Sequence, residues 1–347
     1  MFGDGWYESV DYSLLRMRER NILRITPVEK GWGPDYLRMG VNLELADQGA
    51  TFDLRLGYQK TWLNRLGAEL LVTAQIGSTY GAGVEFYQPL DGAQHFFVEP
   101  IAYYERKKSS IYQEDLKIAE YQVGSAVAQV AAGINVGLLG QVRAGWYEKK
   151  LSASLETGLP VFPTGSVRYG GGFVGLEFDQ FNRLYFPSKG WATRLRYFSS
   201  PEQNFSRLDA RVEGVYPIES YVLGAKATYA GSPSGRLPLF DAGQLGGFLN
   251  MSAFATGQLV GDDVTYAQLK VEKIIGTFPL GLRGDMRLGL ALEAAYRGEA
   301  YTETKRTGVL NSTTLYIGGE TPLGPLYLGY GYSTSGTWNA YFFLGTP

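Results

Sequence analysis

Apolar and polar residues alternate strictly along many segments of this chain. In residues 36–45 every odd-numbered position is a large apolar residue, whereas the even-numbered positions include Arg38, Asn42 and Glu44. The same pattern recurs in residues 52–58, 207–213, 266–272 and 286–293. Side chains of a β-strand point alternately to its two faces. The period of two therefore predicts strands with one apolar and one polar face.

The alternation predicts sixteen strands along the chain. They lie near residues 36–46, 50–61, 66–78, 81–90, 96–113, 116–136, 140–156, 166–182, 189–199, 204–217, 220–231, 263–275, 285–301, 312–320, 325–333 and 337–346. Short connections at residues 89–94, 137–140, 217–220 and 321–325 follow even-numbered strands, and we expect longer, more polar loops after odd-numbered strands. An even strand number with short periplasmic turns and longer outer loops is typical of bacterial outer-membrane barrels.

Two architectures could accommodate so many two-faced strands. A soluble sandwich would need a very large shared core to cover all the apolar faces. A closed barrel turns the apolar faces toward lipid and the polar faces toward a water-filled lumen, and it leaves no strand edge unpaired in hydrocarbon. We therefore predict an all-β protein whose residues 34–347 form a transmembrane, sixteen-stranded antiparallel β-barrel of the outer-membrane type.

Three sets of residues should mark the faces of this barrel. The predicted lipid-facing residues include Leu37, Val41, Leu54, Leu56, Leu269, Leu288 and Leu290. The charged residues predicted on the inner face carry both signs and are Arg38, Arg55, Arg143, Arg194, Arg196, Arg211, Glu213, Lys270 and Glu272. Aromatic residues at segment ends suit interfacial girdles, although each is equally compatible with internal packing: Trp62, Tyr103, Tyr104, Trp146 and Tyr147. Mixed charges can pair across the lumen, so we expect no single selective ring.

Composition excludes several classes of protein. The chain has 347 residues, and its net charge of -2 argues against nucleic acid as a partner. It contains no cysteine and a single histidine, His95, so disulfides are excluded and neither a metal site nor a cofactor is predicted. No apolar run approaches the roughly 20 residues that a membrane-spanning helix needs, and no signal peptide opens the chain.

Residues 1–33 do not follow the barrel pattern. They contain two short strands joined by RERN at residues 18–21, followed by a connection rich in Gly and Pro. An isolated hairpin of this size is only marginally stable. We therefore interpret it as the end of a truncated soluble domain, and the chain as a fragment of a longer protein.

The longest predicted loop, residues 233–262, contains the uncharged segment QLGGFLNMSAF at residues 244–254. Two adjacent glycines, Gly246 and Gly247, permit a tight backbone path. A neutral apolar segment can be buried without leaving an unpaired charge. We expect this sixth outer loop to fold into the lumen, and the alternative is an ordered surface loop.

Three motifs resemble the bacterial surface-antigen superfamily, which includes outer-membrane assembly factors and two-partner secretion transporters. The hairpin followed by VEKGWGPDYLRMGVNL is similar to the end of a polypeptide-transport-associated (POTRA) domain entering its barrel. FDQFNRLYFPSKG resembles the superfamily's strand end and turn before the ninth strand, with Asp179, Pro187 and Gly190 at the motif positions. Where the superfamily's sixth loop has two glycines, three residues and Val-Arg-Gly-Phe or Tyr, this chain has the motif residues Gly246, Gly247, Met251, Ser252, Ala253 and Phe254.

The resemblance implies that the sixth loop packs against the inner wall of strands twelve and thirteen. In the superfamily the motif arginine pairs with acidic residues of this wall, for which Glu272 and Glu293 are the positional matches. Here Ser252 replaces the arginine and Ala253 the following glycine. Hydrogen bonds and packing must then hold the loop, and the two glutamates need other partners. The candidate cations are Lys270, Arg283 and Arg287.

The serine form of the motif resembles the barrels of patatin-like phospholipase autotransporters (type Vd secretion), which carry a lipase upstream of one POTRA domain. This chain lacks the lipase motif Gly-x-Ser-x-Gly, since the nearest segment, GSPSG at residues 231–235, has Pro233 at the serine position. We expect a non-enzymatic outer-membrane barrel that anchors, and helps export or display, an N-terminal passenger. The alternatives are a stand-alone translocase or insertase of the superfamily and a porin.

The expected partners are the lipid bilayer and lipopolysaccharide, the barrel assembly machinery, a covalently linked upstream passenger and a second copy in a homodimer. The POTRA remnant should lie on the periplasmic side. At the other end, Trp338, Ala340, Phe342 and Leu344 should face outward, and the last strand should pair with the first around residues 36–45. Relatives end on an aromatic residue, so we hypothesise that the natural protein continues with at least a Phe after Pro347.

Overall fold

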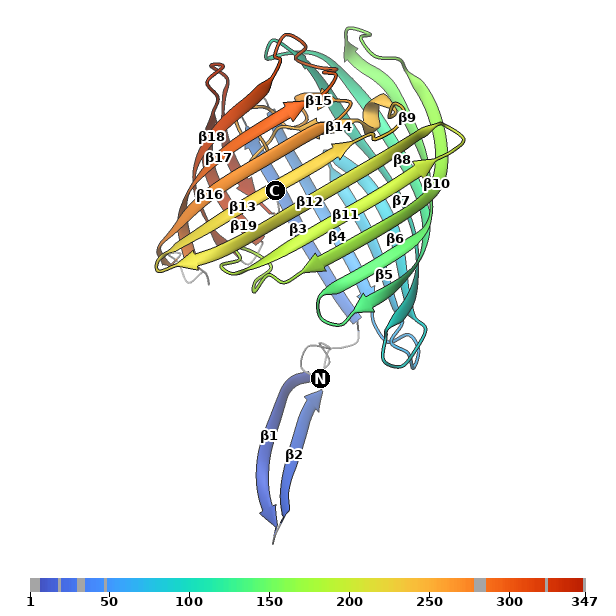
Figure 1. Cartoon of the computed structure of the whole chain (residues 1–347), viewed down its shortest axis with the longest axis vertical. Coiled ribbons are helices and arrows are strands. Elements are labelled where there is room, and N and C mark those ends of the chain that lie inside the picture. Colours follow the sequence, from blue (N-terminus) through green and yellow to red (C-terminus); the bar gives the residue numbers. More distant parts are fainter. Residues whose placement is uncertain are drawn as a thin grey trace.

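A closed antiparallel barrel of sixteen strands forms most of the molecule (Figure 1). The computed structural model describes residues 7–17, 20–29, 35–46, 49–277, 285–321 and 324–345. The barrel strands are β3 (Asp35–Ala46), β4 (Gly49–Lys60), β5 (Glu69–Gly77), β6 (Thr79–Pro89), β7 (Phe96–Gln113), β8 (Leu116–Val136), β9 (Gly140–Gly158), β10 (Gly165–Asp179), β11 (Gly190–Ser200), β12 (Phe205–Ile218), β13 (Tyr221–Gly231), β16 (Val264–Thr277), β17 (Asp285–Arg297), β18 (Val309–Thr321), β19 (Gly324–Tyr332) and β20 (Trp338–Leu344). The predicted all-β fold, a closed antiparallel barrel of sixteen strands, is confirmed.

Each of the sixteen predicted strands has a counterpart in the barrel, but the predicted alternation of loop lengths is wrong in the first half. After odd-numbered barrel strands, a single residue joins β5 to β6, and Glu114 and Asp115 alone join β7 to β8. After even-numbered strands, residues 61–68 and 180–189 form longer connections. The predicted strands 96–113 and 116–136 coincide with β7 and β8, so the strand assignment is right here and only the expected loop length is wrong.

The two faces of the barrel wall differ as predicted. Along β17 every second residue from Arg287 to Arg297 is buried, and the residues between them, such as Leu288 and Leu290, are exposed. Leu37 and Leu269 are likewise exposed on the outer face. The inner face is thus polar and the outer face apolar, as a barrel in a bilayer requires.

The aromatic predictions are only partly right. Tyr104 and Trp146 are exposed on the outer face. Tyr147 instead packs edge-on against the buried ring of Phe198, and Tyr103 lies opposite the buried Val127. Neighbouring residues of a strand cannot face the same side, so only one member of each pair could be a girdle residue.

The last strand closes the barrel against the first, as predicted. β20 pairs with β3 from Tyr341–Ala46 to Leu344–Leu43, which is four residue pairs. This is the shortest strand pairing among the described residues of the barrel. The hypothesis of a terminal aromatic residue concerns positions beyond Leu344 and Gly345, outside the described residues.

The N-terminal hairpin is a separate two-stranded sheet of β1 (Tyr7–Met17) and β2 (Arg20–Glu29). Figure 1 shows it outside the barrel. Its assignment to a POTRA domain stays a prediction. Within the described ranges, no helix is long and apolar enough to cross a membrane.

Candidate functional site

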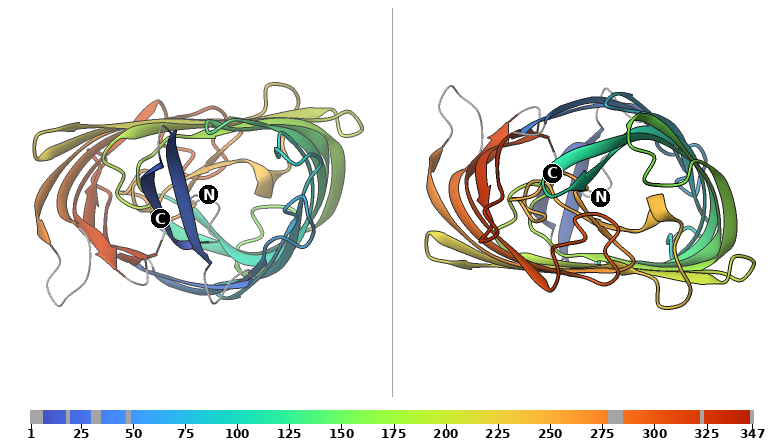
Figure 2. Two further views of the ribbon diagram at one scale, coloured as in Figure 1. Left: turned by 90° about the horizontal axis from the view of Figure 1, so that it is seen from below. Right: turned by 90° about the horizontal axis from the view of Figure 1, so that it is seen from above.

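The candidate functional site is the sixth loop, residues 232–263 between β13 and β16, which we call loop 6. It contains the short 3-10 helix η2 (Leu239–Asp241) and a small hairpin of β14 (Gly243–Leu245) and β15 (Leu259–Gly261). Figure 2, which views the barrel from both ends, shows this segment inside the ring of strands. Loop 6 therefore occupies the interior of the barrel, where its contacts decide whether the lumen is open.

Gly246 and Gly247 open the tip of loop 6, which we define as residues 246–254. Their φ angles are 119° and 98°, and a Cβ atom on Gly246 would lie 2.0 Å from the carbonyl oxygen of Ala255. The Gly246 amide donates to the Asn250 carbonyl over 2.8 Å, and the Gly247 amide donates to the Phe254 carbonyl over 2.9 Å. Only glycine fits this path without strain, which explains the pair of glycines in the motif.

A single carboxylate of the barrel wall binds the tip. The amide of Met251 donates to Oε1 of Glu293 over 3.1 Å, and the amide of Ser252 donates to Oε2 over 2.9 Å. The hydroxyl of Tyr266 donates to Oε1 over 2.7 Å, and that of Thr314 to Oε2 over 2.9 Å. Glu293 is only 3% exposed. Several donors to one carboxylate compensate its removal from water, and here backbone amides take the place of the motif arginine.

Apolar packing supports the same tip. Met251, Ala253 and Phe254 are fully buried and belong to one cluster with side chains of β16, β17 and β18. Tyr341 of β20 donates its hydroxyl to the Phe254 carbonyl over 3.0 Å. The Ser252 side chain accepts the amide of Leu249 over 2.8 Å and therefore stays within the tip. The tip thus bridges from β16 to β20 across the inner wall.

Glu272, the other expected wall residue, does not contact the tip. It pairs with Arg287 over 2.7 Å and with Lys270 over 3.1 Å, and it accepts the Tyr316 hydroxyl over 2.6 Å. The fully buried Arg287 also donates to the carbonyl of Phe186 over 2.7 Å. Lys270 and Arg287 are two of the three cations predicted for this role, and Arg283 lies outside the described residues.

The carbonyl of Phe186 connects Glu272 to the second motif, the turn from Asp179 to Gly190. Asp179 ends β10 and accepts the amide of Phe181 over 2.8 Å. Pro187 offers its carbonyl to Arg287 over 3.3 Å, and Gly190 has a φ of 120° with no room for a Cβ beside the Gln180 carbonyl. This turn folds inward, so the motif positions shape a plug segment at the end of the barrel opposite the outer loops.

Loop 6 and this turn meet in one aromatic cluster. The rings of Phe186 and Phe248 each lie 5.1 Å from the ring of Tyr327, measured between centroids. Tyr316, Tyr341 and Phe343 complete the cluster. Segments that enter from the two ends of the barrel therefore touch inside it. A cavity of about 710 Å³ remains beside them, lined by charges that include Arg211, Glu213 and Lys270.

A second anchor, which the sequence analysis missed, holds the first half of loop 6. Asp241 accepts Lys149 over 2.6 Å and the hydroxyl of Tyr169, and Arg207 donates to its carbonyl oxygen. Burial alone would raise the pKa of Asp241, but Lys149 and Arg207 hold it below its ordinary value of 3.8. The alternation of the two strand faces places Lys149 and Tyr169 on the inner face of β9 and β10, and this pattern could have indicated the anchor.

A third set of contacts closes the mouth from outside. The amides of Glu114 and Asp115, at the tip of the β7–β8 hairpin, donate to the carboxylate of Glu303 over 3.0 and 2.9 Å. Gln258 of loop 6 donates to Asp115 over 2.9 Å and to Glu303 over 3.0 Å. Glu303 is only 1% exposed, and Figure 2 shows the hairpin reaching across the opening. The sequence analysis expected a longer, more polar loop after this strand and predicted none of these contacts.

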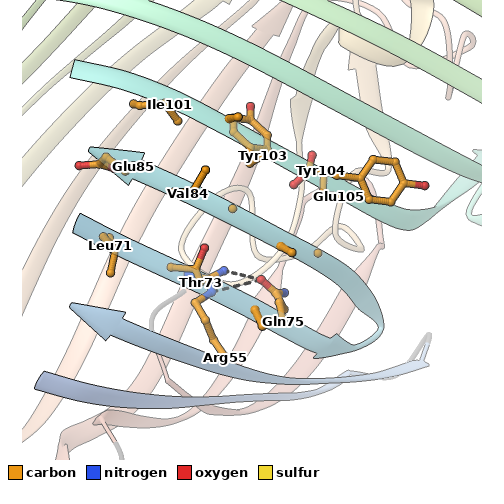
Figure 3. Close-up of a pocket in the computed structure, with 15 residues that line it drawn as sticks. Arg55, Leu71, Thr73, Gln75, Val84, Glu85, Ile101, Tyr103, Tyr104 and Glu105 are labelled. Atoms are coloured by element: carbon orange, nitrogen blue, oxygen red, sulfur yellow. Dashed lines mark hydrogen bonds between the residues drawn. The ribbon is translucent and has the colours of Figure 1, made fainter. Parts of the chain in front are cut away.

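Several other inner-wall charges have partners within the wall. Arg143 binds Glu99 over 2.7 Å and Glu177 over 3.3 Å. Arg55 donates to Gln75 over 2.9 Å and 3.1 Å, beside a cavity of about 260 Å³ (Figure 3). No group of three His, Cys, Asp or Glu residues that could hold a metal occurs in the part of the chain that the structure describes.

Several solved structures share this architecture. BamA from Haemophilus ducreyi lacking POTRA domains 1-3 has a TM-score of 0.71 at 14% identity, with 98% of this chain and 75% of that chain covered. CdiB from Acinetobacter baumannii has a TM-score of 0.63 at 12% identity, with 98% and 65% covered. CdiB from Escherichia coli has a TM-score of 0.65 at 12% identity, with 97% and 68% covered. These likenesses show a shared fold. Neither a protein-family model nor the sequence of a curated protein matches this chain.

Proposed function

We propose that this chain is an outer-membrane barrel of the superfamily that BamA and CdiB exemplify. In this role it anchors, and helps export or display, a passenger carried upstream on the same polypeptide. The observation that carries the proposal is a barrel whose interior is occupied by a loop bound through Glu293 rather than through a motif arginine. That serine form of the loop resembles the patatin-like autotransporters, so a patatin-like lipase is the proposed passenger.

The proposed membrane location rests on the two faces of the wall. The outer face carries aliphatic residues such as Leu37, Leu269 and Leu292, and every barrel strand is paired on both sides. A closed barrel satisfies its backbone within hydrocarbon. The hairpin of β1 and β2 precedes β3 at the end with the even-numbered turns, which is the periplasmic end in such barrels. We assign it to the periplasm as the remnant of a POTRA domain.

No catalytic role is proposed for the chain. The functional groups inside the barrel fix loop 6 and the turn at residues 180–189 in place, so the interior is an occluded passage. A passenger would then need loop 6 to move, the wall to open, or a path outside the lumen. The expected partners remain the bilayer with lipopolysaccharide, the assembly machinery that inserts barrels, the attached passenger and a second copy of the chain.

The second candidate is a stand-alone translocase or insertase, and a specific observation favours it. Among the residues that the structure describes, four pairs join β20 to β3, so the wall has a weak seam through which a substrate strand could pair. A porin fits less well, because loop 6 and the aromatic cluster around Tyr327 fill the interior.

The discriminating experiment fuses a folded reporter domain upstream of Met1 and compares it with the same reporter expressed separately beside the barrel. The passenger model expects protease-accessible reporter on the cell surface only when the two are fused. The insertase model expects the separate reporter, or other outer-membrane proteins, to depend on the barrel. Surface display that is unchanged when the barrel is replaced by an unrelated outer-membrane anchor would contradict an export role.

A further inference from the structure

The outer face of the barrel carries a cluster of cations on β7, β9 and β10, with β8 between β7 and β9. We define the outer cation cluster as Arg106 of β7, Lys150 of β9 and Arg168 of β10, all of which are exposed. Lys149 precedes Lys150 and Tyr169 follows Arg168, and both of these neighbours contact Asp241 inside the barrel. Adjacent residues of a strand face opposite sides. Lys150 and Arg168 therefore project from the wall toward its surroundings.

The three cations lie at a similar distance along their strands. Arg106 is ten positions from Phe96, which begins β7, and Lys150 is ten positions from Gly140, which begins β9. Arg168 is eleven positions from Asp179, the last residue of β10. A tilted strand needs about 9–11 residues to cross the hydrocarbon of a bilayer. In the proposed membrane, all three cations therefore lie where the hydrocarbon ends and the outer headgroups begin.

Aromatic residues lie just below the cluster. Tyr104 precedes Arg106 by two positions on the same face of β7, and Trp146 lies four positions before Lys150 on the same face of β9. Both are exposed. Tyr and Trp favour the boundary between hydrocarbon and headgroups. The positions of Tyr104 and Trp146 therefore support a location of the three cations at the boundary between the hydrocarbon and the outer headgroups.

The charges within the cluster are incompletely balanced. Lys150 and Arg168 are directly paired across β9 and β10, where like charges repel. Arg168 binds Glu148 over 2.7 Å, an exposed pair that contributes little by itself. Neither Arg106 nor Lys150 forms an ion pair with any residue that the structure describes. A neighbouring cation, Lys108, differs because Glu120 and Glu156 both bind it.

We propose that the outer cation cluster binds the phosphate groups of a lipid in the outer leaflet, and that the phosphorylated lipid A part of lipopolysaccharide is this lipid. A phosphate between Lys150 and Arg168 would relieve their repulsion, and Arg suits phosphate because its planar head donates two parallel hydrogen bonds. The inference rests on the proposed outer-membrane location, but it does not depend on a passenger.

The test measures the thermal unfolding midpoint of the full chain in phosphatidylcholine vesicles with and without bisphosphorylated lipid A. A ligand that binds the folded state raises the midpoint. We expect lipid A to raise it for the wild type and for Lys273→Gln, a matched control whose outward cation lies over the Tyr221 ring on β16 and β13. The double variant Lys150→Gln/Arg168→Gln should lose most of the shift, with about a tenfold weaker apparent affinity.

Two further measurements identify the molecule that supplies the phosphate and test whether Arg168 binds it. Dephosphorylated lipid A and free inorganic phosphate should each leave the wild-type midpoint unchanged. Glu148→Gln removes the competing carboxylate from Arg168, so it should enlarge the lipid A shift, which a merely structural ion pair would not do. Should the double variant fail to fold, Arg106→Gln is the deciding variant and should lose part of the shift.

An equal lipid A shift in the wild type and the double variant would overturn the proposal, as would a full shift with dephosphorylated lipid A or with inorganic phosphate. Failure of reporter display in the passenger experiment would leave these shifts unchanged. A chain that does not insert into vesicles at all would instead contradict the membrane location on which both proposals rest.

Discussion

Glu293 is the residue on which the tip of loop 6 depends most directly. Its carboxylate accepts hydrogen bonds from two tip amides and from the hydroxyls of Tyr266 and Thr314. The sequence placed Glu293 opposite the loop through the family motif. It could not show that backbone amides replace the missing arginine, because those donors depend on the conformation that Gly246 and Gly247 allow. Glu272 is linked to the turn at residues 180–189 only through Arg287, which binds Glu272 and donates to the carbonyl of Phe186, and the sequence could not show this three-dimensional contact.

Substituting Glu293 by Gln should destabilise the tip. The amide nitrogen of Gln is a donor, and it would face groups that already donate, so at least one buried donor would lose its acceptor. We expect a loss of about 1–3 kcal/mol in the free energy of unfolding in vesicles, measured by urea titration. Glu299→Gln is the matched control, because Glu299 is exposed and its one ion pair among the described residues is with the exposed Arg236. Equal urea midpoints for the two variants would contradict the role of Glu293.

Asp241 should make the first half of loop 6 sensitive to acid. Its folded-state pKa is depressed below 3.8 by Lys149 and Arg207, against the opposing effect of burial. The charged form therefore contributes stability that is complete above the ordinary pKa and is lost as the pH falls through the depressed folded value. We expect increased protease cleavage within residues 232–242 below about pH 3.8. Asp241→Asn should show that cleavage already at neutral pH, and identical pH profiles would contradict the anchor.

The strands are the elements that the sequence predicted best. Alternation identified all sixteen barrel strands and the direction of both faces in β3 and β17, because the side-chain period follows from strand geometry alone. The predicted bounds 96–113 and 116–136 coincide with β7 and β8, whereas the expected loop lengths were wrong because the period of two carries no information about connection length. The contact of Asp115 with Glu303 was also unpredictable, since it joins residues 188 positions apart through no periodic signal.

The opposite faces of β4 provide a direct test of this assignment. Leu54 belongs to the outer, lipid-facing set, whereas Arg55 binds Gln75 on the inner wall. Leu54→Arg places a charge in hydrocarbon and should cost about 2–4 kcal/mol near the midplane of the bilayer. Arg55→Leu, the paired control, loses only hydrogen bonds to one side chain and should cost less. Urea titration of both variants in liposomes measures this, and equal sensitivity would contradict the assigned faces.

The molecule as a whole is a barrel closed at three levels. The β7–β8 hairpin spans the mouth, loop 6 occupies the interior, and the turn at residues 180–189 packs into the barrel from the other end, beside a cavity of about 710 Å³. In planar bilayers we therefore expect the purified chain to give small or irregular conductance. Deleting residues 244–256 from loop 6 should increase it, while Leu138→Ala, at an exposed side chain in the turn between β8 and β9, serves as the control. Large, steady, ohmic channels from the intact chain would contradict the plugged barrel.

The pairing of β20 with β3, which closes the sheet into a barrel, determines where the barrel should open first. Alternation predicted that β20 would meet β3, but the extent of their pairing depends on strand ends, which the pattern defines poorly. The pairing comprises four residue pairs, whereas β4 and β5 share eight. Each pairing contributes hydrogen bonds, so the short seam should separate before any longer one does.

A cysteine pair across the seam tests this order directly, because the chain has no cysteine of its own. Leu45 and Phe342 are directly opposed across β3 and β20, and Leu56 and Ala74 are opposed across β4 and β5 as a control. Oxidation of Leu45→Cys/Phe342→Cys should raise the temperature at which the folded band disappears in gel-shift assays by more than oxidation of Leu56→Cys/Ala74→Cys does. The crosslink at the seam prevents the first step of opening, whereas the control joins strands that separate later. Equal shifts from the two crosslinks would mean that the barrel does not open first between β20 and β3.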